Sequence, residues 1–180
     1  MARWGYAGEL AVGQQLIELT RNDCWVFHDV MFNKHFNIDH VLVAPNGVFA
    51  IETKARSKHL KVSDKNYKVS YDGKGLVWPG SNGFVDYTFI KQARDRTRDF
   101  QKWLSKAVGE NIPVVPVLSL PGWMVERKGR GDVSVLSHKE IPGLLKARTD
   151  FQMNDSLRTR IIHQLDQKVR DVSFQPEDNK

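Results

Sequence analysis

The sequence predicts a mixed α/β fold, on two observations. Segments with helical and with strand periodicity alternate along the chain, in the order helix, three strands, helix, strand and then smaller elements. Hydrophobic residues make up 41% of the 180 residues and charged residues 27%, the balance of an ordinary globular protein. We expect a single domain over 1–172, with a core over 5–120, a C-terminal extension over 121–172 and a flexible tail over 173–180.

The first two elements are predicted from the spacing of their apolar residues. Residues 5–20 repeat apolar side chains at helical spacing, and the same stripe extended backwards reaches Glu9. A strand follows over 25–32, interrupted at His28-Asp29. A carboxylate on the apolar stripe of a helix is the first sign of a functional site.

A β-hairpin is predicted over 38–54. Asn46-Gly47 separates two runs of apolar and β-branched residues, which is the strongest short-range hairpin signal in a sequence. A two-residue Asn46-Gly47 loop pairs residues whose numbers sum to 93, so that Asp39 lies opposite Lys54. The same register sets Val41 opposite Glu52.

Side-chain alternation then brings unlike charges together. Residues two apart on a strand share a face, so Glu52 joins Asp39 and Lys54, and the opposite face receives apolar residues. With Glu9 added, three carboxylates and one lysine leave a deficit of about two positive charges. A hard divalent cation such as Mg²⁺ would fill that deficit with oxygen ligands. By the same alternation His40 points to the other face, as a hydrogen-bonded core histidine.

The rest of the chain predicts further elements of both kinds. These are a long connection over 55–88 with a small hairpin at Asp72-Gly73, an amphipathic helix over 88–108, a buried strand over 114–120, a short strand over 133–136, and a last helix capped by Asp155-Ser156. Trp78 in the long connection is expected to pack against the core rather than to stack on an unpaired base.

The basic balance of the chain favours a polyanionic partner. Its formal net charge is +6 and its pI is about 9.5. Two sets of cations, on the outer face of the 88–108 helix and in the 55–88 connection, are candidates for contacts to nucleic-acid phosphates: Lys91, Arg94, Arg96, Arg98, Lys102 and Lys106, and Arg56, Lys58, Lys61, Lys65, Lys68 and Lys74. The alternative is a solvated helix face, because Asp95 and Asp99 pair with some of these cations.

The neighbourhood of the charged residues resembles a known family. Gly-Tyr-Ala-Gly-Glu at 5–9, Asn-Ile-Asp-His at 37–40 and Ile-Glu-Thr-Lys at 51–54 are similar to the motifs of the nuclease-related domain, NERD. That family belongs to the PD-(D/E)xK superfamily of restriction-endonuclease-like folds. The resemblance implies an αβββαβ core with a central mixed sheet flanked by helices, and a C-terminal helical extension.

The resemblance also implies an activity and its residues. It implies DNA cleavage that depends on Mg²⁺ or Mn²⁺, with Asp39, Glu52, Glu9 and the main-chain carbonyl of Thr53 as metal ligands. Lys54 matches the catalytic lysine of the family. Gln92 matches the glutamine at the start of the helix after the hairpin, without the Asn-Pro that commonly precedes it. We expect the nucleic-acid contacts from Lys91, Arg94, Arg98, Arg56 and Lys58.

Other functions stay open at this point. The domain is alternatively a nucleic-acid-binding module that does not cut, or a regulatory domain that works with a helicase or other DNA-processing partner, and RNA is an alternative substrate. No apolar run approaches the roughly 18 residues of a membrane helix, and the single cysteine, Cys24, cannot form an intrachain disulfide. We therefore expect a cytoplasmic protein without a membrane partner.

Overall fold

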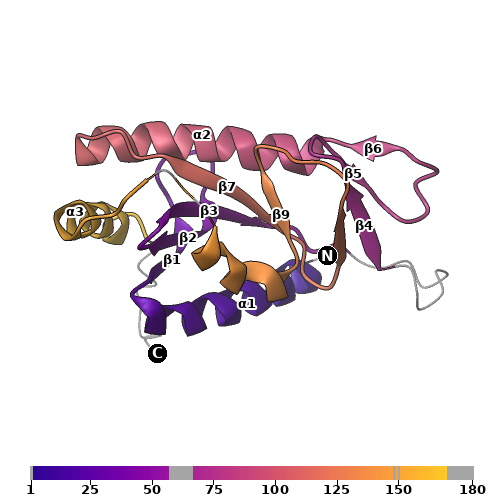
Figure 1. The fold of residues 1–180 in the computed structure, drawn as a ribbon, viewed down its shortest axis with the longest axis horizontal. Coiled ribbons are helices and arrows are strands. Elements are labelled where there is room, and N and C mark those ends of the chain that lie inside the picture. The colour runs from indigo at the N-terminus through magenta and orange to yellow at the C-terminus, as the bar shows by residue number, and fades with distance from the viewer. Residues whose placement is uncertain (1, 57–66, 148, 150, 170–180) are drawn as a thin grey trace, which may run out of the picture.

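A five-stranded mixed sheet forms the centre of the protein. The computed structural model describes residues 2–56, 67–147, 149 and 151–169. The sheet has the strand order β1-β2-β3-β7-β9, with α1 along one face and α2 along the other (Figure 1). The bounds are α1 Ala2–Leu19, β1 Trp25–Val30, β2 Ile38–Ala44, β3 Gly47–Thr53, α2 Thr88–Val108, β7 Val114–Ser119 and β9 Ser134–Leu136. The predicted α/β fold is confirmed, and the arrangement is consistent with the restriction-endonuclease-like core.

Smaller elements complete the described part of the chain. A second sheet, of order β6-β5-β4-β8, stands beside the first half of α2 (Figure 1). The remaining bounds are η1 Thr20–Asn22, β4 Lys68–Tyr71, β5 Leu76–Val77, β6 Val85–Asp86, β8 Met124–Arg127, η2 His138–Lys146 and α3 Asp155–Asp166. No helix in the described ranges is both long enough and apolar enough to cross a membrane.

Each face of the central sheet has its own core. Leu42 and Ile51 point to one face, where they pack with Leu16 of α1. Val41 and Ala50 point to the other face and pack with the second half of α2 and with α3. This division follows from side-chain alternation in β2 and β3, and it also sends the charged residues of these strands toward α2.

The hairpin register differs from the predicted one. The turn is Pro45-Asn46, and Ala44 pairs with Gly47, so that paired residue numbers sum to 91 rather than 93. The predicted register would have placed Pro45 in the ladder, where proline has no N–H to donate. The shift of two residues preserves the faces, and it moves Asp39 from opposite Lys54 to opposite Glu52.

Several element predictions are confirmed. The helix over 88–108 has the predicted bounds, and the small hairpin at Asp72-Gly73 joins β4 to β5. Trp78 is buried at 4% exposure and packs edge-on against Trp123, with ring centroids 5.0 Å apart. Cys24 is a free, buried cysteine.

Other element predictions are corrected. The strand predicted over 25–32 ends at Val30, and the predicted interruption is confined to Asp29, which has a left-handed φ of 50° and is skipped in the register with β2. The last helix is capped by Asn154, whose side chain accepts a hydrogen bond from Leu157 N, rather than by Asp155-Ser156. The predicted tail over 173–180 lies outside the described residues.

Candidate active site

Glu52 is the most deeply buried charged residue of the site. It lies near the C-terminal end of β3 and is 0% exposed. Its Oε2 accepts a hydrogen bond from Arg96 Nη1 at 2.9 Å and lies 3.7 Å from Lys54 Nζ, whereas Oε1 is buried without a partner in the described ranges. Burial and the charge of Asp39 raise the pKa of Glu52 to about 7, against the lowering effect of Arg96 and Lys54.

Asp39 lies directly across the hairpin from Glu52. Its Oδ2 accepts a hydrogen bond from the main-chain N–H of Thr53 at 2.8 Å. Burial raises the pKa of Asp39, and Asp29 on the neighbouring strand raises it further, although the Thr53 hydrogen bond, Lys54 and Arg96 act in the opposite direction. Both pKa values are raised because the burial of the two adjacent carboxyl groups outweighs the lowering effect of Lys54 and Arg96.

The main chain of β3 is fixed on both sides of this carboxylate pair. Lys54 N donates to Ser119 O at 3.0 Å on the β7 side, whereas Thr53 N donates to Asp39 on the β2 side. Because the N–H and C=O of one strand residue point to the same edge, the Thr53 carbonyl also faces Asp39. Three oxygen-bearing groups, from Asp39, Glu52 and Thr53, therefore lie at one end of the hairpin.

Arg96 is a site residue that the sequence analysis assigned to the wrong surface. The sequence predicts that Arg96 points outward from the 88–108 helix, but its guanidinium turns inward to Glu52 and lies over the ring of Phe36, 5.6 Å from its centroid. Gln92 lies one helical turn earlier, and its amide oxygen, when turned to this side, accepts a hydrogen bond from Arg96 Nη2 at 2.6 Å. The i,i+4 spacing places Gln92 and Arg96 on one face of the helix, but the spacing alone does not show that this face turns toward β3.

Glu9 reaches the site from the opposite face of the sheet. Gly8 lets α1 approach the end of β3 closely, because a Cβ at this position would lie 2.9 Å from Ala55 Cβ. Glu9 is exposed, yet partial burial and the charges of Asp39 and Asp29 raise its pKa, and Lys54 lowers it. Glu9 is therefore an electrostatic neighbour of Asp39 at the rim of the site.

The expected triple carboxylate cluster is not formed. Within the described ranges, no group of three or more His, Cys, Asp or Glu side chains is arranged to hold a metal ion. Asp39 and Glu52 converge as predicted, and Glu9 remains at the rim because α1 covers the other face of the sheet. A metal at this site would therefore rest on two carboxylates and a main-chain carbonyl.

The cations predicted to contact phosphates are largely paired within the protein. Lys91 and Arg98 both pair with Asp95, at 3.4 and 3.1 Å. Arg94 makes a two-pronged ion pair with Asp132, through Nε to Oδ2 and through Nη2 to Oδ1. Arg56 lies 3.8 Å from Asp86 and 4.5 Å from the centroid of the Trp78 ring, and Lys58 lies outside the described residues.

The prediction for His40 is confirmed. It is 5% exposed on the α1 face, and its Nδ1 lies 2.7 Å from Nδ1 of His28. Burial, with a further contribution from His28, lowers the pKa of His40 to about 3. The pair is a structural element of the core.

One of three comparisons with known proteins found a match. The family model described as the nuclease-related domain, NERD, matches residues 4–121. That span runs from α1 through β7 and contains Glu9, Asp39, Glu52, Lys54 and Arg96. Searches of curated proteins and of solved structures gave no match. Because the matched span is more than half of the chain, the chain belongs to the nuclease-related domain family.

Proposed function

We propose that this chain is a divalent-metal-dependent nuclease that hydrolyses phosphodiester bonds in DNA. The observation that carries the proposal is the buried pair of Asp39 and Glu52 beside Lys54. Glu52 Oε1 has no partner in the described part of the chain, and the pKa values of both carboxyl groups are raised. A buried carboxylate oxygen in this state requires a cation or a donor.

The residues of the site fit a hard cation. Asp39, Glu52 and the Thr53 carbonyl would hold Mg²⁺ or Mn²⁺, which prefer oxygen ligands. Such an ion supplies a Lewis acid for the phosphoryl oxygen and a more acidic coordinated water. Glu9, at the rim, would act through a water molecule rather than as a direct ligand.

The cations of the site can stabilise the negative charge that develops during hydrolysis. Lys54 Nζ lies 3.7 Å from Glu52 Oε2 and is 23% exposed, so it borders both the carboxylates and solvent. From there it would hold the attacking water and stabilise the negative charge that grows on the phosphoryl oxygens. Arg96 keeps Glu52 Oε2 in place through its 2.9 Å hydrogen bond, and Gln92 orients Arg96.

The test is cleavage of a supercoiled plasmid and of a single-stranded circle with Mg²⁺ or Mn²⁺. We expect cleavage that EDTA abolishes and that Glu52→Gln or Lys54→Ala lowers by about 100-fold or more. The chain offers a matched control, because Glu126 and Lys128 form a second Glu-x-Lys pair, exposed and 3.5 Å apart. Undiminished activity in both site variants would refute the assignment.

One observation favours a second function. Arg96 neutralises Glu52 without any metal, and no group of three metal-binding side chains occurs in the described ranges. A domain that keeps the fold and binds nucleic acid without cutting it would have this arrangement. Salt-sensitive DNA binding with no turnover under either metal would support this alternative over the nuclease.

A further inference from the structure

The hairpin that joins β5 to β6 carries the most exposed large apolar side chain of the described residues. Phe84 is 72% exposed, and the hairpin projects from the molecule beside the start of α2 (Figure 1). In the described part of the chain, no other ring and no cation makes a contact with the Phe84 ring. An aromatic ring presented to solvent in this way is typical of a binding surface.

The exposure of Phe84 does not come from a loose loop. Ser81 N donates to Trp78 O at 3.2 Å, and Phe84 N donates to Ser81 O at 3.0 Å. Ser81 Oγ also donates to Phe84 O, at 3.2 Å. Gly80 and Gly83 have left-handed φ values of 79° and 81°, which two successive turns require. The main chain therefore holds Phe84 in place before any partner arrives.

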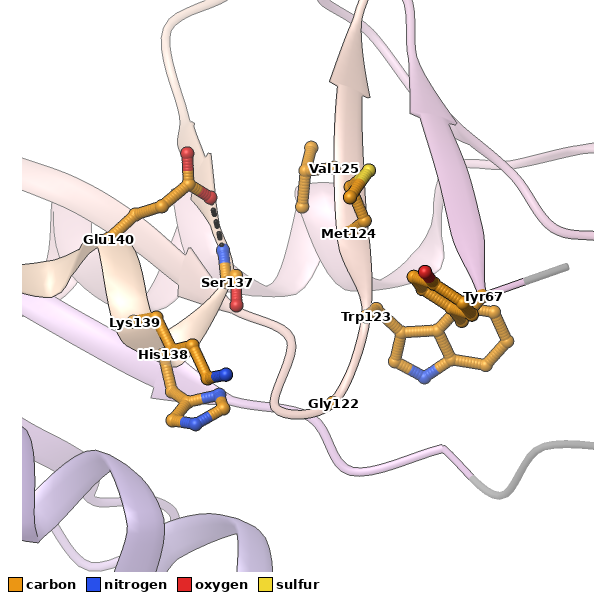
Figure 2. A pocket seen from close by; sticks show the side chains of 9 residues that line it. All are labelled: Tyr67, Gly122, Trp123, Met124, Val125, Ser137, His138, Lys139 and Glu140. Atoms are coloured by element: carbon orange, nitrogen blue, oxygen red, sulfur yellow. Dashed lines mark hydrogen bonds between the residues drawn. The ribbon is translucent and has the colours of Figure 1, made fainter. Parts of the chain in front are cut away.

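The base of the hairpin is packed on the core of the second sheet. Trp78 lies edge-on to Trp123, whose side chain borders the pocket drawn in Figure 2, and the two ring centroids are 5.0 Å apart. Trp78 Nε1 donates to Asp86 Oδ2 at 3.3 Å. A Cβ at Gly75 would lie 2.9 Å from Tyr87 Cδ1, so the Tyr87 ring lies against the main chain there. The hairpin is therefore a firm support for Phe84.

Cations border the exposed ring. Phe84 and Asp86 are two residues apart in an extended segment and share a face. The Asp86 carboxylate accepts from Thr88 N at 2.9 Å and lies 3.8 Å from Arg56 Nη1, so its charge is offset. The Arg56 side chain remains 40% exposed, and Lys91, in the first turns of α2, is 76% exposed. An open aromatic ring next to partly open cations suits a nucleobase and its phosphate.

The hairpin lies within reach of the candidate active site. Arg56 is two residues beyond Lys54 in the chain. On the other side, Arg96 lies about 14 Å further along α2 than Tyr87, at about 1.5 Å per residue. This separation corresponds to about four nucleotides at the spacing of about 3.4 Å along one DNA strand. A strand with a phosphate at the carboxylate pair would therefore reach Phe84 about four nucleotides away.

We propose that the β5–β6 hairpin binds an unpaired nucleobase of DNA, stacked on Phe84, with Arg56 near the adjoining phosphate. The proposal rests on the proposed nuclease function and narrows its substrate to DNA with an unpaired region. A base within a duplex is stacked on both faces by its neighbours, so it cannot stack on Phe84 without leaving the helix. Stacking on an aromatic ring is tolerant of sequence, so no base preference follows.

The test measures binding without cleavage. The full chain is titrated, in EDTA and at fixed salt, against a fluorescein-labelled single strand and against the same strand with abasic sites. Both strands carry the same phosphates, so contacts from Arg56 and Lys91 are the same in both. We expect the abasic strand to bind about tenfold more weakly than the intact strand. Equal affinity for the two strands would overturn the proposal.

Variants at Phe84 assign the effect to the hairpin. Phe84→Leu keeps an apolar side chain but removes the flat ring, so it should weaken the intact strand by about tenfold and leave the abasic strand unchanged. Phe84→Trp keeps a flat ring and should bind the intact strand at least as tightly as the wild-type protein. Ile17→Ala is the control, because Ile17 is an apolar residue of α1 that is 59% exposed. Because Phe84 is a surface residue, these variants should fold as the wild-type protein does.

A different occupant of the hairpin would give a different result. If Phe84 docks on a second copy of the chain, Phe84→Leu will leave DNA binding unchanged and will lower self-association in sedimentation, which would overturn the proposal. Absence of cleavage with Mg²⁺ or Mn²⁺ would refute the nuclease function, whereas a tenfold abasic effect in EDTA that depends on Phe84 would still establish the base-binding hairpin. The two failures are therefore distinguishable.

Discussion

Arg96 changes the charge balance that the sequence suggests for the site. The sequence places Lys54 as the one cation beside Asp39, Glu52 and Glu9, whereas the structure adds the guanidinium of Arg96 at 2.9 Å from Glu52. The inward turn of Arg96 could not be predicted, because α2 carries five other basic residues and only its packing on β3 selects one of them. The two strand carboxylates could be predicted, because their faces follow from alternation alone.

The raised pKa of Glu52 predicts a stability cost in the metal-free protein. Folded Glu52 has a pKa of about 7, and the ordinary value is 4.5, so the native state binds more protons than the unfolded state between these pH values. Stability from this group is present below pH 4.5 and is lost as the pH rises through 7. Glu52→Gln should therefore raise the free energy of unfolding at pH 8 by up to about 3 kcal/mol.

The check is urea denaturation in EDTA at pH 8 and at pH 4.5. The advantage of Glu52→Gln should shrink toward zero at the lower pH, where the wild-type carboxyl group is protonated in the folded state and about half protonated in the unfolded state. Glu126→Gln, at an exposed position, should change little at either pH. A Glu52→Gln protein that is less stable than wild type at pH 8 would show that the ionised carboxylate stabilises the fold.

At the scale of elements, features that depend on the local sequence could be predicted, and the pairing of strands far apart in the sequence could not. The bounds of α2 follow from a long apolar repeat that ends at Gly109, whose φ of 79° and N–H bond to Ser105 O close the helix. By contrast, β8 has four residues, and its partner β4 lies more than fifty residues away in the sequence. The predicted hairpin register differs from the observed one by two residues, because the two-residue turn is Pro45-Asn46 rather than Asn46-Gly47.

The close approach of α1 to β3 is testable at Gly8. Gly8→Ala places a Cβ 2.9 Å from Ala55 Cβ, so α1 must shift. We expect a loss of about 1–3 kcal/mol in the free energy of unfolding, together with reduced nuclease activity because Glu9 moves away from Asp39. Both are measured on the purified variant, by denaturation and by plasmid cleavage.

Gly13→Ala is the matched control on the same helix. A Cβ there would meet only His28 Cε1, at 3.8 Å, which is an ordinary contact. Replacement of glycine by alanine within a helix should then stabilise the protein by about 0.5–1 kcal/mol and leave activity unchanged. Equal stability of the Gly8→Ala and Gly13→Ala variants would contradict the close-approach argument.

At the scale of the whole molecule, the net charge of +6 does not show which cations could bind phosphates. Lys91, Arg94 and Arg98 each have an acidic partner, yet Lys91 and Arg98 remain exposed on the first half of α2. If these two contact phosphates, the double variant Lys91→Ala/Arg98→Ala should reduce the slope of log K against log salt by about 2.

The salt titration needs a control from the same helix. Lys106→Ala, at the far end of α2, should give the same slope of log K against log salt as the wild-type protein. A double variant with an unchanged slope would mean that Lys91 and Arg98 belong to a solvated surface, and that DNA is held elsewhere. The basic composition alone could not separate these outcomes, because it does not show which cations are paired.

The most direct measurement is anomalous diffraction from a crystal of the wild-type protein soaked in Mn²⁺. An ion bound by Asp39, Glu52 and the Thr53 carbonyl is the result that our account predicts, with Glu52 Oε1 among its ligands. An anomalous map without a peak at the hairpin end, while Arg96 still holds Glu52, would contradict the account.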